Sequence, residues 1–407
     1  MGKLAAAWRI WRRTGTLQFL QFVVARVSPT FFTRPSSLRY EDAIAADWET
    51  PHPATIHPRP VGEEPLVVAW VMSPPVASSG GHQNLFRFIR VLESAGHQVR
   101  IYLYSANDFY SPEDVKNLVR GSSHFAGVTA SIENYPAGGV DDDVDVIVSS
   151  NWPTAYRSFR DKSLAHRFYF IQDFEPDFYP VSSESVLAEN TYRFGFFGIT
   201  AGAWLSEKLH REYGMKTAHF DFGSNLDNYR ITNQGERSEV LFYARPSTTR
   251  RGFELGIMAL DLVHQARPDV HIHLVGQKLT KRQRRVPFPH SAPGSLGLHE
   301  LNELYNRCRV GLVLSLSNLS LLPLELLSSG VIPVVNDAPN NRAVSDNPFI
   351  EYTSLSPRAL ADRILEILDH PDAAAHATKA AHSVEGSSWD NAAKQFLDAF
   401  EGEIRGR

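Results

Sequence analysis

The chain has 407 residues, which is too long for one hydrophobic core and favours two domains of ordinary size. It carries 41 Lys and Arg residues against 45 Asp and Glu residues, and a net charge of −4 excludes the broad positive field that nucleic acid requires. The single cysteine, Cys308, excludes internal disulfides and thiolate metal clusters, as is typical of a protein from a reducing cytoplasm.

The first forty residues form a basic segment with seven Lys and Arg residues and no Asp or Glu. Leu4, Trp8 and Trp11 share one helical face, while the apolar run 17–27 is too short and too polar to cross a bilayer. No small-residue cleavage site follows, so we expect no signal peptide. We expect a helix that lies on an anionic membrane surface or packs on the protein's own body. The expected location is cytoplasmic, and peripheral at the inner face of the membrane if this helix binds lipid.

A Pro-rich stretch, 50–65, is predicted to be a linker. The continuous apolar run 66–72 then predicts a strand buried on both faces. Residues 84–96 predict a helix with one apolar face, and 97–104 predict the next strand. Two parallel strands joined by a crossover helix form a βαβ unit.

The same alternation continues to the end of the chain, with a restart near 228–238. Further strands are predicted at 143–150, 167–172, 195–200, 239–244, 270–276, 310–315 and 331–336, and further helices at 152–159, 203–214, 252–266, 298–308, 322–330 and 356–370. This pattern predicts the α/β class, with two doubly wound Rossmann-like domains facing across a cleft. The expected domains are an N-terminal segment 1–64, Rossmann-like domains 65–230 and 237–385, and a C-terminal helix 386–407 that packs back on the first domain.

The segment 168–180, FYFIQDFEPDFYP, places three carboxylates at the exit of a buried strand. In doubly wound sheets, ligands bind at the carboxyl ends of the strands, which in two facing domains look into the cleft. Asp173 is therefore the candidate for chemistry. Glu175 is a candidate for binding hydroxyl groups, and Asp177 is expected to cap the turn or face water.

Two loops of the second domain are predicted to bind phosphate. In YARPSTTRRGFELG, Arg245 follows a strand, and Arg251 precedes Gly252 and a helix, which makes an anion site. In LSLSNLSLLPLELLSSG, the backbone amides around Ser320 and Leu321 are expected to hold a second phosphate. Glu325 then either bridges ribose hydroxyls or acts only as a partner of the helix dipole. Neither loop is a Gly-x-Gly-x-x-Gly or P-loop motif, so a nucleotide sugar is the expected ligand.

These motifs resemble those of the GT-B glycosyltransferases, specifically retaining family 4, over residues 65–400. SSGGHQNLFRFIRVLESAGHQV is similar to the glycine loop and helix of that family, and SNLSLLPLELLSSGVIPVV to its E-x7-E segment. FIQDFEPDFYP, NWPTAY and ARPSTTRRGFELG more closely resemble the WsaF-type rhamnosyltransferases of surface glycan assembly. The resemblance implies a dTDP-β-L-rhamnose donor bound by the second domain, with Asp173 at the reaction centre.

The chain departs from the family pattern at two positions. Ser317 stands where the first acid of E-x7-E is expected, which puts glucose-type donors in doubt and suits a 6-deoxy sugar. Asn225 stands where the family often has the acid of Gly-x-Asp. We still expect Ser317 and Asn318 to lie against the donor ribose or sugar.

The expected mechanism needs no metal and no cofactor beyond the nucleotide sugar. Arg245 and Arg251 neutralise the departing diphosphate, and Asp173 stabilises the cationic sugar or accepts a proton from the acceptor. A metal at the acidic run 141–145 is rejected because this run precedes its strand, where such runs are usually solvated. The acceptor is expected to be a glycan, lipid-linked or free. Its expected binding residues are Gly80, Gly81, His82, Trp152, Thr154, Tyr156, Gln172 and Glu175.

Two other functions stay open. One is a nucleotide-sugar epimerase of similar architecture, which needs acids and a histidine around the sugar but no acceptor. The other is a non-catalytic glycan-binding subunit, which is suggested by Ser317. Arg245, Arg251 and Glu325 argue against the second, since a binding module has little use for a diphosphate clamp.

Overall fold

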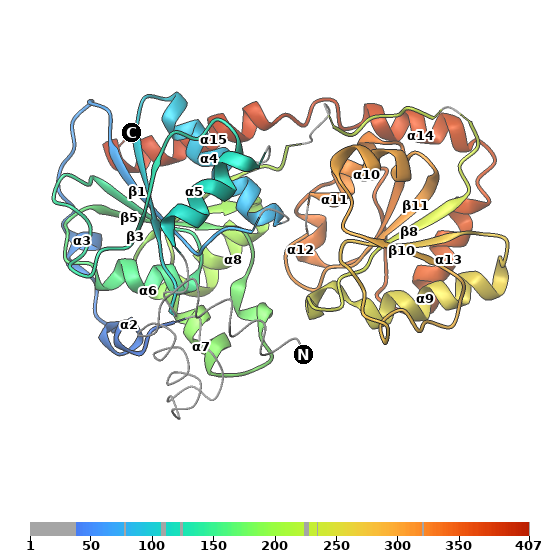
Figure 1. The fold of residues 1–407 in the computed structure, drawn as a ribbon, viewed down its shortest axis with the longest axis horizontal. Coiled ribbons are helices and arrows are strands. Elements are labelled where there is room, and N and C mark those ends of the chain that lie inside the picture. Colours follow the sequence, from blue (N-terminus) through green and yellow to red (C-terminus); the bar gives the residue numbers. More distant parts are fainter. Residues whose placement is uncertain are drawn as a thin grey trace.

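The computed structural model describes residues 38–406, with gaps at 77–78, 107–110, 123–124, 224–227, 234 and 320. Most of the predicted basic N-terminal helix, together with Asn225 and Ser320, therefore lies outside the described residues. The described part forms two α/β domains side by side (Figure 1).

The N-terminal domain is built on a seven-stranded sheet in which every paired neighbour is parallel, in the order β3-β2-β1-β4-β5-β6-β7. Its strands are β1 (Val67–Met72), β2 (Gln98–Leu103), β3 (Ser131–Asn134), β4 (Val146–Ser149), β5 (His166–Ile171), β6 (Phe197–Ala201) and β7 (Thr217–Phe220). The central strands are continuous apolar runs because both faces are covered: Trp70 lies in one buried cluster and Val71 in the other.

Helices cover both faces of this sheet. They are α2 (Tyr40–Ala45), α3 (Pro53–Ile56), α4 (Gly80–Ser94), α5 (Pro112–Gly121), α6 (Trp152–Arg160), α7 (Ser183–Asn190) and α8 (Ala203–Tyr213), with the 3-10 turns η2 (Glu175–Phe178) and η3 (Thr191–Arg193). Phe88 of α4 packs in the cluster on one face, and Tyr156 of α6 and Leu205 of α8 pack in the cluster on the other. The sheet is therefore doubly wound, as the sequence predicts.

The C-terminal domain repeats this plan with a six-stranded parallel sheet in the order β10-β9-β8-β11-β12-β13. Its strands are β8 (Glu239–Tyr243), β9 (Ile272–Val275), β10 (Ser291–Gly294), β11 (Cys308–Val313), β12 (Ile332–Asn336) and β13 (Glu351–Thr353). Its other elements are η4 (Thr249–Arg251), α9 (Phe253–Ala266), α10 (Leu298–Tyr305), α11 (Leu322–Ser328), α12 (Pro339–Arg342), α13 (Pro357–Leu368) and α14 (Ala373–His382). Both predicted doubly wound sheets are thus confirmed.

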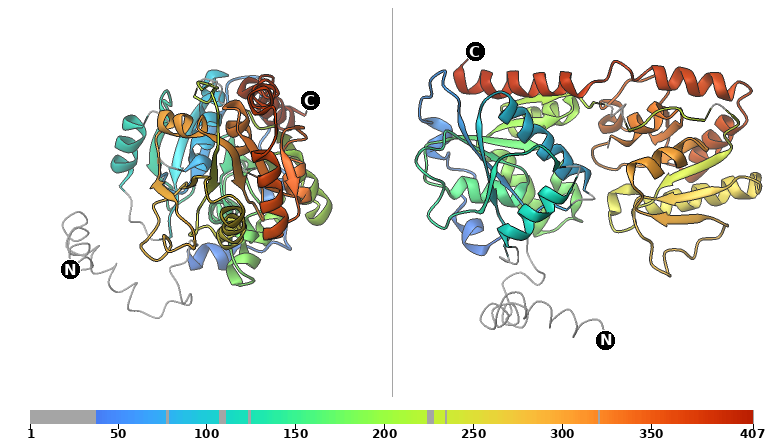
Figure 2. Two further views of the ribbon diagram at one scale, coloured as in Figure 1. Left: turned by 90° about the vertical axis from the view of Figure 1, so that its right-hand side faces the viewer. Right: turned by 45° about the horizontal axis from the view of Figure 1, so that its top comes forward.

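The last helix, α15 (Trp389–Arg405), crosses from the C-terminal domain and lies along the N-terminal domain (Figure 2). Phe396 and Phe400 enter the N-terminal core, where the ring of Phe396 lies 4.8 Å from that of Phe88. An amphipathic helix with one row of buried aromatics needs such a partner face. The two domains are therefore joined by two chain crossings, between β7 and β8 and before α15.

The residues before β1 are packed on the N-terminal domain rather than forming a free linker. Ala54 of α3 is buried, and Arg59 donates to Asp145 at 2.8 Å. Asp42 of α2 is fully buried and accepts from Arg160 at 2.9 Å and from Tyr104 at 2.7 Å. No helix in the described ranges is long and apolar enough to cross a membrane.

Candidate active site between the two domains

Asp173 lies where the two sheets approach each other. It follows β5 by two residues, is 8% exposed, and is held mainly by the opposite domain. Its Oδ1 accepts from the backbone N–H of Asn318 at 2.8 Å, and its Oδ2 accepts from Ser317 Oγ at 3.1 Å and Arg250 Nε at 3.3 Å. Burial raises the pKa of Asp173, while Arg250, Arg251 and these hydrogen bonds act in the opposite direction.

The loop that meets Asp173 is fixed within the C-terminal domain. It follows β11, and its backbone at Ser315 bonds to the side chains of Asn336 at 2.8 Å and Asn341 at 3.1 Å. The Asn318 amide group then reaches the N-terminal domain, donating to the carbonyl oxygens of Gln172 at 2.9 Å and Ala201 at 3.2 Å. Ser317 and Asn318 are therefore buried in the contact between the two domains, at the carboxyl ends of strands from both.

The arginine loop lies on the same side of the C-terminal sheet. Gly252 has a φ of +56°, and a Cβ there would lie 3.2 Å from Leu314, so glycine suits the turn between η4 and α9. Arg251 is buried and donates to Ser315 Oγ at 2.9 Å. Burial lowers the pKa of Arg251, and the Asp173 carboxylate opposes that effect.

Arg245 follows β8 by two residues and lies near the Arg251 loop. One guanidinium nitrogen donates to the hydroxyl of Tyr243 at 3.3 Å. Its Nε is buried and has no hydrogen-bond partner among the described residues. A buried guanidinium nitrogen without a partner is costly, and an anionic ligand would satisfy it.

Arg250 is a cleft residue that the sequence analysis did not assign. Its guanidinium lies 4.0 Å from the ring centre of Phe178, and its Nε faces Asp173. Because residues of a 3-10 turn advance by a third of a turn each, Arg250 and Arg251 point in different directions. Arg250 thus meets Asp173 directly, while Arg251 anchors the loop that holds it. The three arginines of the loop 245–251 indicated an arginine near Asp173. Which of the three faces Asp173 depends on the geometry of the η4 turn.

Glu325 and Arg87 come together from opposite domains. Glu325 lies in α11, and burial raises its pKa to about 7, while the charge of Arg87 in α4 opposes this shift. Arg87 is also placed 3.5 Å from the ring centre of Trp389 and donates to Asn84 at 2.6 Å. Leu321, at the start of α11, has no side-chain cap. The start of α11 therefore faces α4, with a carboxylate and uncapped helix amides near the cleft.

The predicted glycine loop begins α4, next to Gln172. Gln172 Nε2 donates to the carbonyl of Gly81 at 3.3 Å, and Ser79 caps the helix by accepting from the His82 amide at 3.4 Å. His82 Nδ1 is buried without a hydrogen-bond partner in the described part of the chain, and burial lowers the pKa of the ring. Gly80 has open space around it. These residues lie along the N-terminal rim of the cleft.

The other predicted acceptor residues are bonded inside the N-terminal domain. Thr154 Oγ1 donates to the Asn151 carbonyl at 2.7 Å, and the Tyr156 hydroxyl donates to the Leu187 carbonyl at 3.1 Å. The Trp152 backbone amide donates to Glu175 Oε2 at 2.6 Å. These contacts hold the start of α6 and join α6 to α7, so in this structure their polar groups serve the fold.

Glu175 is the carboxyl group beneath this site. It is 4% exposed, and its Oε2 also accepts from the Tyr169 hydroxyl at 3.1 Å. Burial raises the pKa of Glu175 to about 8. A carboxyl at the start of a helix satisfies an amide that has no partner within the helix. Glu175, two residues after Asp173, thus connects α6 to η2.

We expect Glu175→Gln to remove a pH-dependent loss of stability. In the unfolded chain a glutamate titrates near pH 4.3, whereas in the folded protein Glu175 titrates at about pH 8. Between these values unfolding releases a proton, so this group lowers folded-state stability as pH rises and gives a constant penalty above pH 8. Glutamine keeps the acceptor oxygen but does not ionise. The melting temperature of the variant should exceed that of wild type by an increment that grows from pH 5 to pH 8.

A matched control for this experiment is Glu49→Gln, because Glu49 is exposed. Differential scanning calorimetry from pH 5 to pH 9 gives both comparisons. A melting-temperature difference for Glu175→Gln that does not change with pH would show that Glu175 is already ionised in the folded protein.

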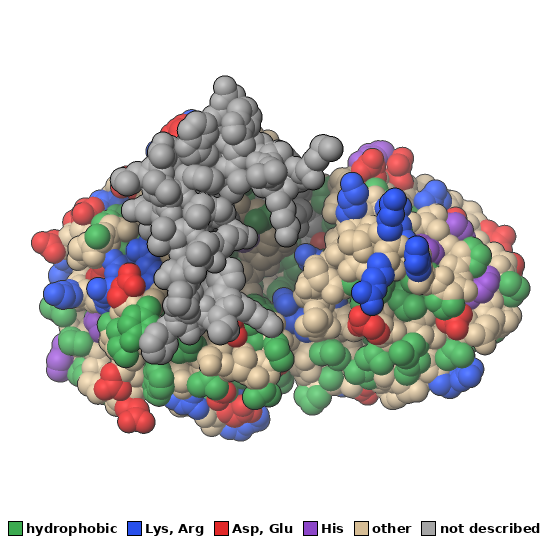
Figure 3. All heavy atoms as spheres, turned by 60° about the horizontal axis from the view of Figure 1, so that its bottom comes forward, with side chains coloured by type: hydrophobic (Ala, Val, Ile, Leu, Met, Phe, Trp, Pro, Cys, Tyr) green, Lys and Arg blue, Asp and Glu red, His purple; other side chains and the backbone are tan. Residues whose placement is uncertain are grey.

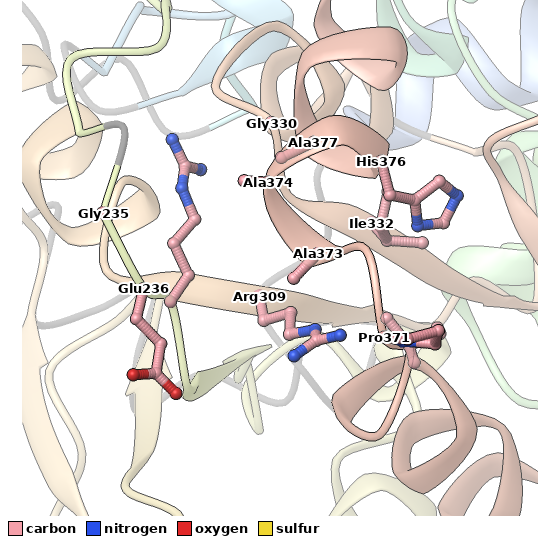
Figure 4. Close-up of a pocket in the computed structure, with 12 residues that line it drawn as sticks. Gly235, Glu236, Arg309, Gly330, Ile332, Pro371, Ala373, Ala374, His376 and Ala377 are labelled. Carbon is pink, nitrogen blue, oxygen red and sulfur yellow. The ribbon is translucent and has the colours of Figure 1, made fainter.

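The acidic run 141–145 and a cavity of the C-terminal domain lie away from Asp173. Asp143 pairs with Arg100 at 2.5 Å on the surface, before β4 begins. The cavity, of about 370 Å³, lies at the amino ends of β8, β11 and β12 and beside the start of α14 (Figure 4). Its arginines, Arg237 and Arg309, both donate to backbone carbonyl oxygens. The cleft, in contrast, lies at the carboxyl ends of the strands, and a space-filling view shows the hollow between the domains (Figure 3).

This arrangement of two doubly wound domains, with a polar site between the carboxyl ends of their strands, defines the GT-B glycosyltransferase fold. Solved structures agree. Anabaena HepE, in complex with UDP and glucose, covers 83% of this chain and 100% of its own, with a TM-score of 0.63 and 16% identity. A putative UDP-N-acetylglucosamine 2-epimerase from Listeria monocytogenes covers 84% of this chain and 98% of its own, with a TM-score of 0.53 and 11% identity.

Sequence comparisons identify more specific similarities within the glycosyltransferases. Residues 238–365 match the model of the WsaF C-terminal domain, and residues 140–200 match that of the WsaF N-terminal domain. A segment of each domain is therefore similar to the corresponding domain of WsaF. It is also 32% identical over 253 residues to the O-antigen biosynthesis protein RfbC of Myxococcus xanthus, a match that covers 60% of this chain. The match spans only 20% of the length of that curated relative.

Proposed function

We propose that the protein is a glycosyltransferase that moves a sugar from a nucleotide sugar to a glycan acceptor in surface polysaccharide biosynthesis. The observation that carries this proposal is the meeting of the Asp173 carboxylate with the loops of Arg250 and Ser317 across the cleft. A carboxylate from one domain and cationic groups from the other suit a reaction in which a cationic sugar separates from an anionic leaving group. RfbC, named for O-antigen biosynthesis, and HepE, solved with UDP and glucose, support the same class.

The C-terminal domain is the proposed donor site. Arg245 has a buried guanidinium nitrogen without a partner among the described residues, and we assign it to the diphosphate with Arg251. The start of α11, where Leu321 provides no side-chain cap, adds backbone amides that favour an anion, and the phosphate contact expected of Ser320 stays a prediction. Glu325 is assigned to the ribose or sugar hydroxyls. In this proposal the guanidinium groups neutralise the leaving diphosphate, so transfer requires no metal.

Asp173 is the proposed catalytic group. Its carboxylate either stabilises the cationic sugar or takes the acceptor proton, and attack from the face that the diphosphate leaves gives retention of configuration. In this structure the Asp173 oxygens already accept from Ser317 and Asn318. A substrate hydroxyl must therefore replace at least one of these bonds before Asp173 acts.

The proposed donor sugar is L-rhamnose, carried as dTDP-β-L-rhamnose. The segments similar to WsaF support this choice, and Ser317 replaces an acid that contacts the donor sugar in the wider family. The Asp173 carboxylate lies 3.1 Å from Ser317 Oγ, so a carboxylate is still present at this point of the cleft, supplied from the opposite domain. A 6-deoxy sugar presents one hydroxyl fewer to this site.

The acceptor is proposed to lie along the N-terminal rim, beside Gly81, His82 and Gln172. His82 Nδ1 is buried without a partner among the described residues and is a candidate to bind an acceptor hydroxyl. A lipid-linked glycan fits the polysaccharide pathway that the relative's name states. We propose that the basic segment before residue 38 brings the protein to an anionic membrane surface at its cytoplasmic face.

We expect dTDP-rhamnose to raise the melting temperature of the purified protein more than UDP-glucose or GDP-mannose, since ligands of the native state stabilise it by mass action. With a glycan acceptor, the product should be the extended glycan, and NMR should show an anomeric configuration like that of the donor. An epimerase of the same fold would instead change the sugar of the donor without any acceptor. A glycan-binding subunit would give no shift with any nucleotide sugar.

A further inference from the structure

Three possible metal ligands lie together in the C-terminal domain, far along the sheet from the proposed active site. They are a carboxylate oxygen of Glu239, a ring nitrogen of His273 and the Sγ of Cys308, and all three atoms lie within 4.8 Å of one another. Glu239 and Cys308 are the first residues of β8 and β11. The cluster is therefore at the amino ends of the strands, opposite the cleft.

The pairing of three adjacent strands brings these side chains to one face of the sheet. In the parallel ladders, Cys308 is paired with Glu239, and Leu241 is paired with His273. Glu239 and Leu241 are two residues apart and so point to the same face, and laterally paired residues share that face. The cluster is thus set by backbone hydrogen bonds rather than by flexible loops.

The donors match the preference of zinc. Cys308 is fully buried, His273 is 5% exposed, and the Glu239 side chain is 26% exposed. Zinc combines sulfur, imidazole nitrogen and carboxylate oxygen at about 2.0–2.3 Å, which puts tetrahedral ligand atoms roughly 3.3–3.8 Å apart. Magnesium and calcium prefer oxygen ligands alone. The cluster is therefore suited to a borderline or soft divalent cation.

We propose that Glu239, His273 and Cys308 bind one zinc-type divalent cation that ties β8, β9 and β11 together. A groove of about 860 Å³ adjoins His273 and is also lined by Ser291, Asn306 and Arg307. This groove gives the cation an entry path and leaves room for water as a fourth ligand. Lying at the opposite end of the sheet from Arg245, the metal stabilises the domain and takes no part in sugar transfer.

The same residues also form contacts that need no metal. His273 Nε2 lies 2.7 Å from Glu239 Oε2, and Arg307 Nε lies 3.3 Å from the same oxygen. Binding a cation requires that this histidine–carboxylate contact open and that Arg307 turn away. The Arg307 side chain is 57% exposed, so it has solvent to move into. If these residues form only an ion pair, the protein should bind no divalent cation here. If they form a metal site, it should bind one.

The test is titration of the full-length, untagged protein, first stripped by a chelator, with cobalt(II). Cobalt bound to a thiolate absorbs in the near ultraviolet by sulfur-to-metal charge transfer, and Cys308 is the one cysteine of the chain. We expect this band to saturate at equimolar cobalt and to disappear when zinc is added. Wild-type protein without such a band would overturn the proposal, and this outcome does not depend on any variant.

Variants then identify the ligands. Cys308→Ser should abolish the band, and His273→Gln should weaken cobalt binding at least about tenfold, as loss of groups that support a metal typically does. His299→Gln removes an exposed histidine that pairs with Glu303 on α10, and it should bind cobalt as wild type does. Zinc should raise the melting temperature of wild type and His299→Gln but not of Cys308→Ser. Binding that His299→Gln abolishes and His273→Gln leaves intact would place the metal elsewhere.

Discussion

Asp173→Asn is expected to reduce sugar transfer by about 10²–10⁴-fold, the usual contribution of a positioned acid or base. Asparagine has the same shape and keeps an oxygen that can accept from the Asn318 amide, but it carries no charge and takes up no proton. Donor binding should stay close to that of wild type, because the proposed diphosphate contacts come from the other domain. Initial rates with saturating acceptor and calorimetry with the nucleotide sugar measure the two effects separately.

Asp173 also connects the domains, so two controls are needed. Asp177→Asn makes the same change in the adjoining 3-10 turn at an exposed position and should leave transfer unchanged. Ser317→Ala removes a hydroxyl that donates to the Asp173 carboxylate without altering the charge of Asp173, and loss of a hydrogen bond to a charged group corresponds to roughly a ten- to hundredfold effect. If Ser317→Ala lost as much activity as Asp173→Asn, the contact between domains, rather than the carboxylate, would be the important feature.

The two sheets were predictable because parallel strands buried on both faces are continuous apolar runs. Residues 66–72 and 331–336 are such runs, and each forms a strand that is paired on both sides within its sheet. None of the four edge strands, β3, β7, β10 and β13, was predicted. In β3 only Ile132 is buried, and β10 reads SAPG, so neither carries an apolar run. An edge strand forms because it pairs with the neighbouring strand of the sheet, and the local sequence pattern does not contain that pairing.

The location of the candidate site could be predicted from the sequence, but only some of its side-chain contacts could. The carboxyl end of β5 and the loop after β8 follow from topology, which brings Asp173 and the arginine loop to the same cleft. Which arginine faces Asp173 depends on the turn at η4, and Arg250 takes that place. Glu175 lies beneath the cleft because its partner, the Trp152 amide, is 23 residues away in the chain. Long-range partners of this kind are fixed by packing and leave no local signature.

Arg245→Gln is expected to weaken binding of the nucleoside diphosphate by about 10–100-fold, which corresponds to the loss of one or two hydrogen bonds to a charged group. Arg245 Nε is buried without a partner in the described part of the chain, so a bound anion satisfies a group that the protein leaves unpaired. Glutamine keeps a similar length and polarity but loses the positive charge and the paired donors. Calorimetric titration with dTDP measures the effect directly.

A second arginine distinguishes this specific contact from the general charge of the domain. Arg282→Gln removes one positive charge from an exposed position of the same domain and should leave dTDP affinity unchanged. If Arg245 contacts the diphosphate, Arg245→Gln should weaken the binding of dTDP more than the binding of thymidine, because thymidine has no phosphate for Arg245 to contact. Equal losses for both ligands would mean that Arg245 supports the nucleoside pocket or the fold. Loss of affinity in Arg282→Gln to the same degree would show that long-range attraction, rather than a diphosphate clamp, draws the nucleotide to this domain.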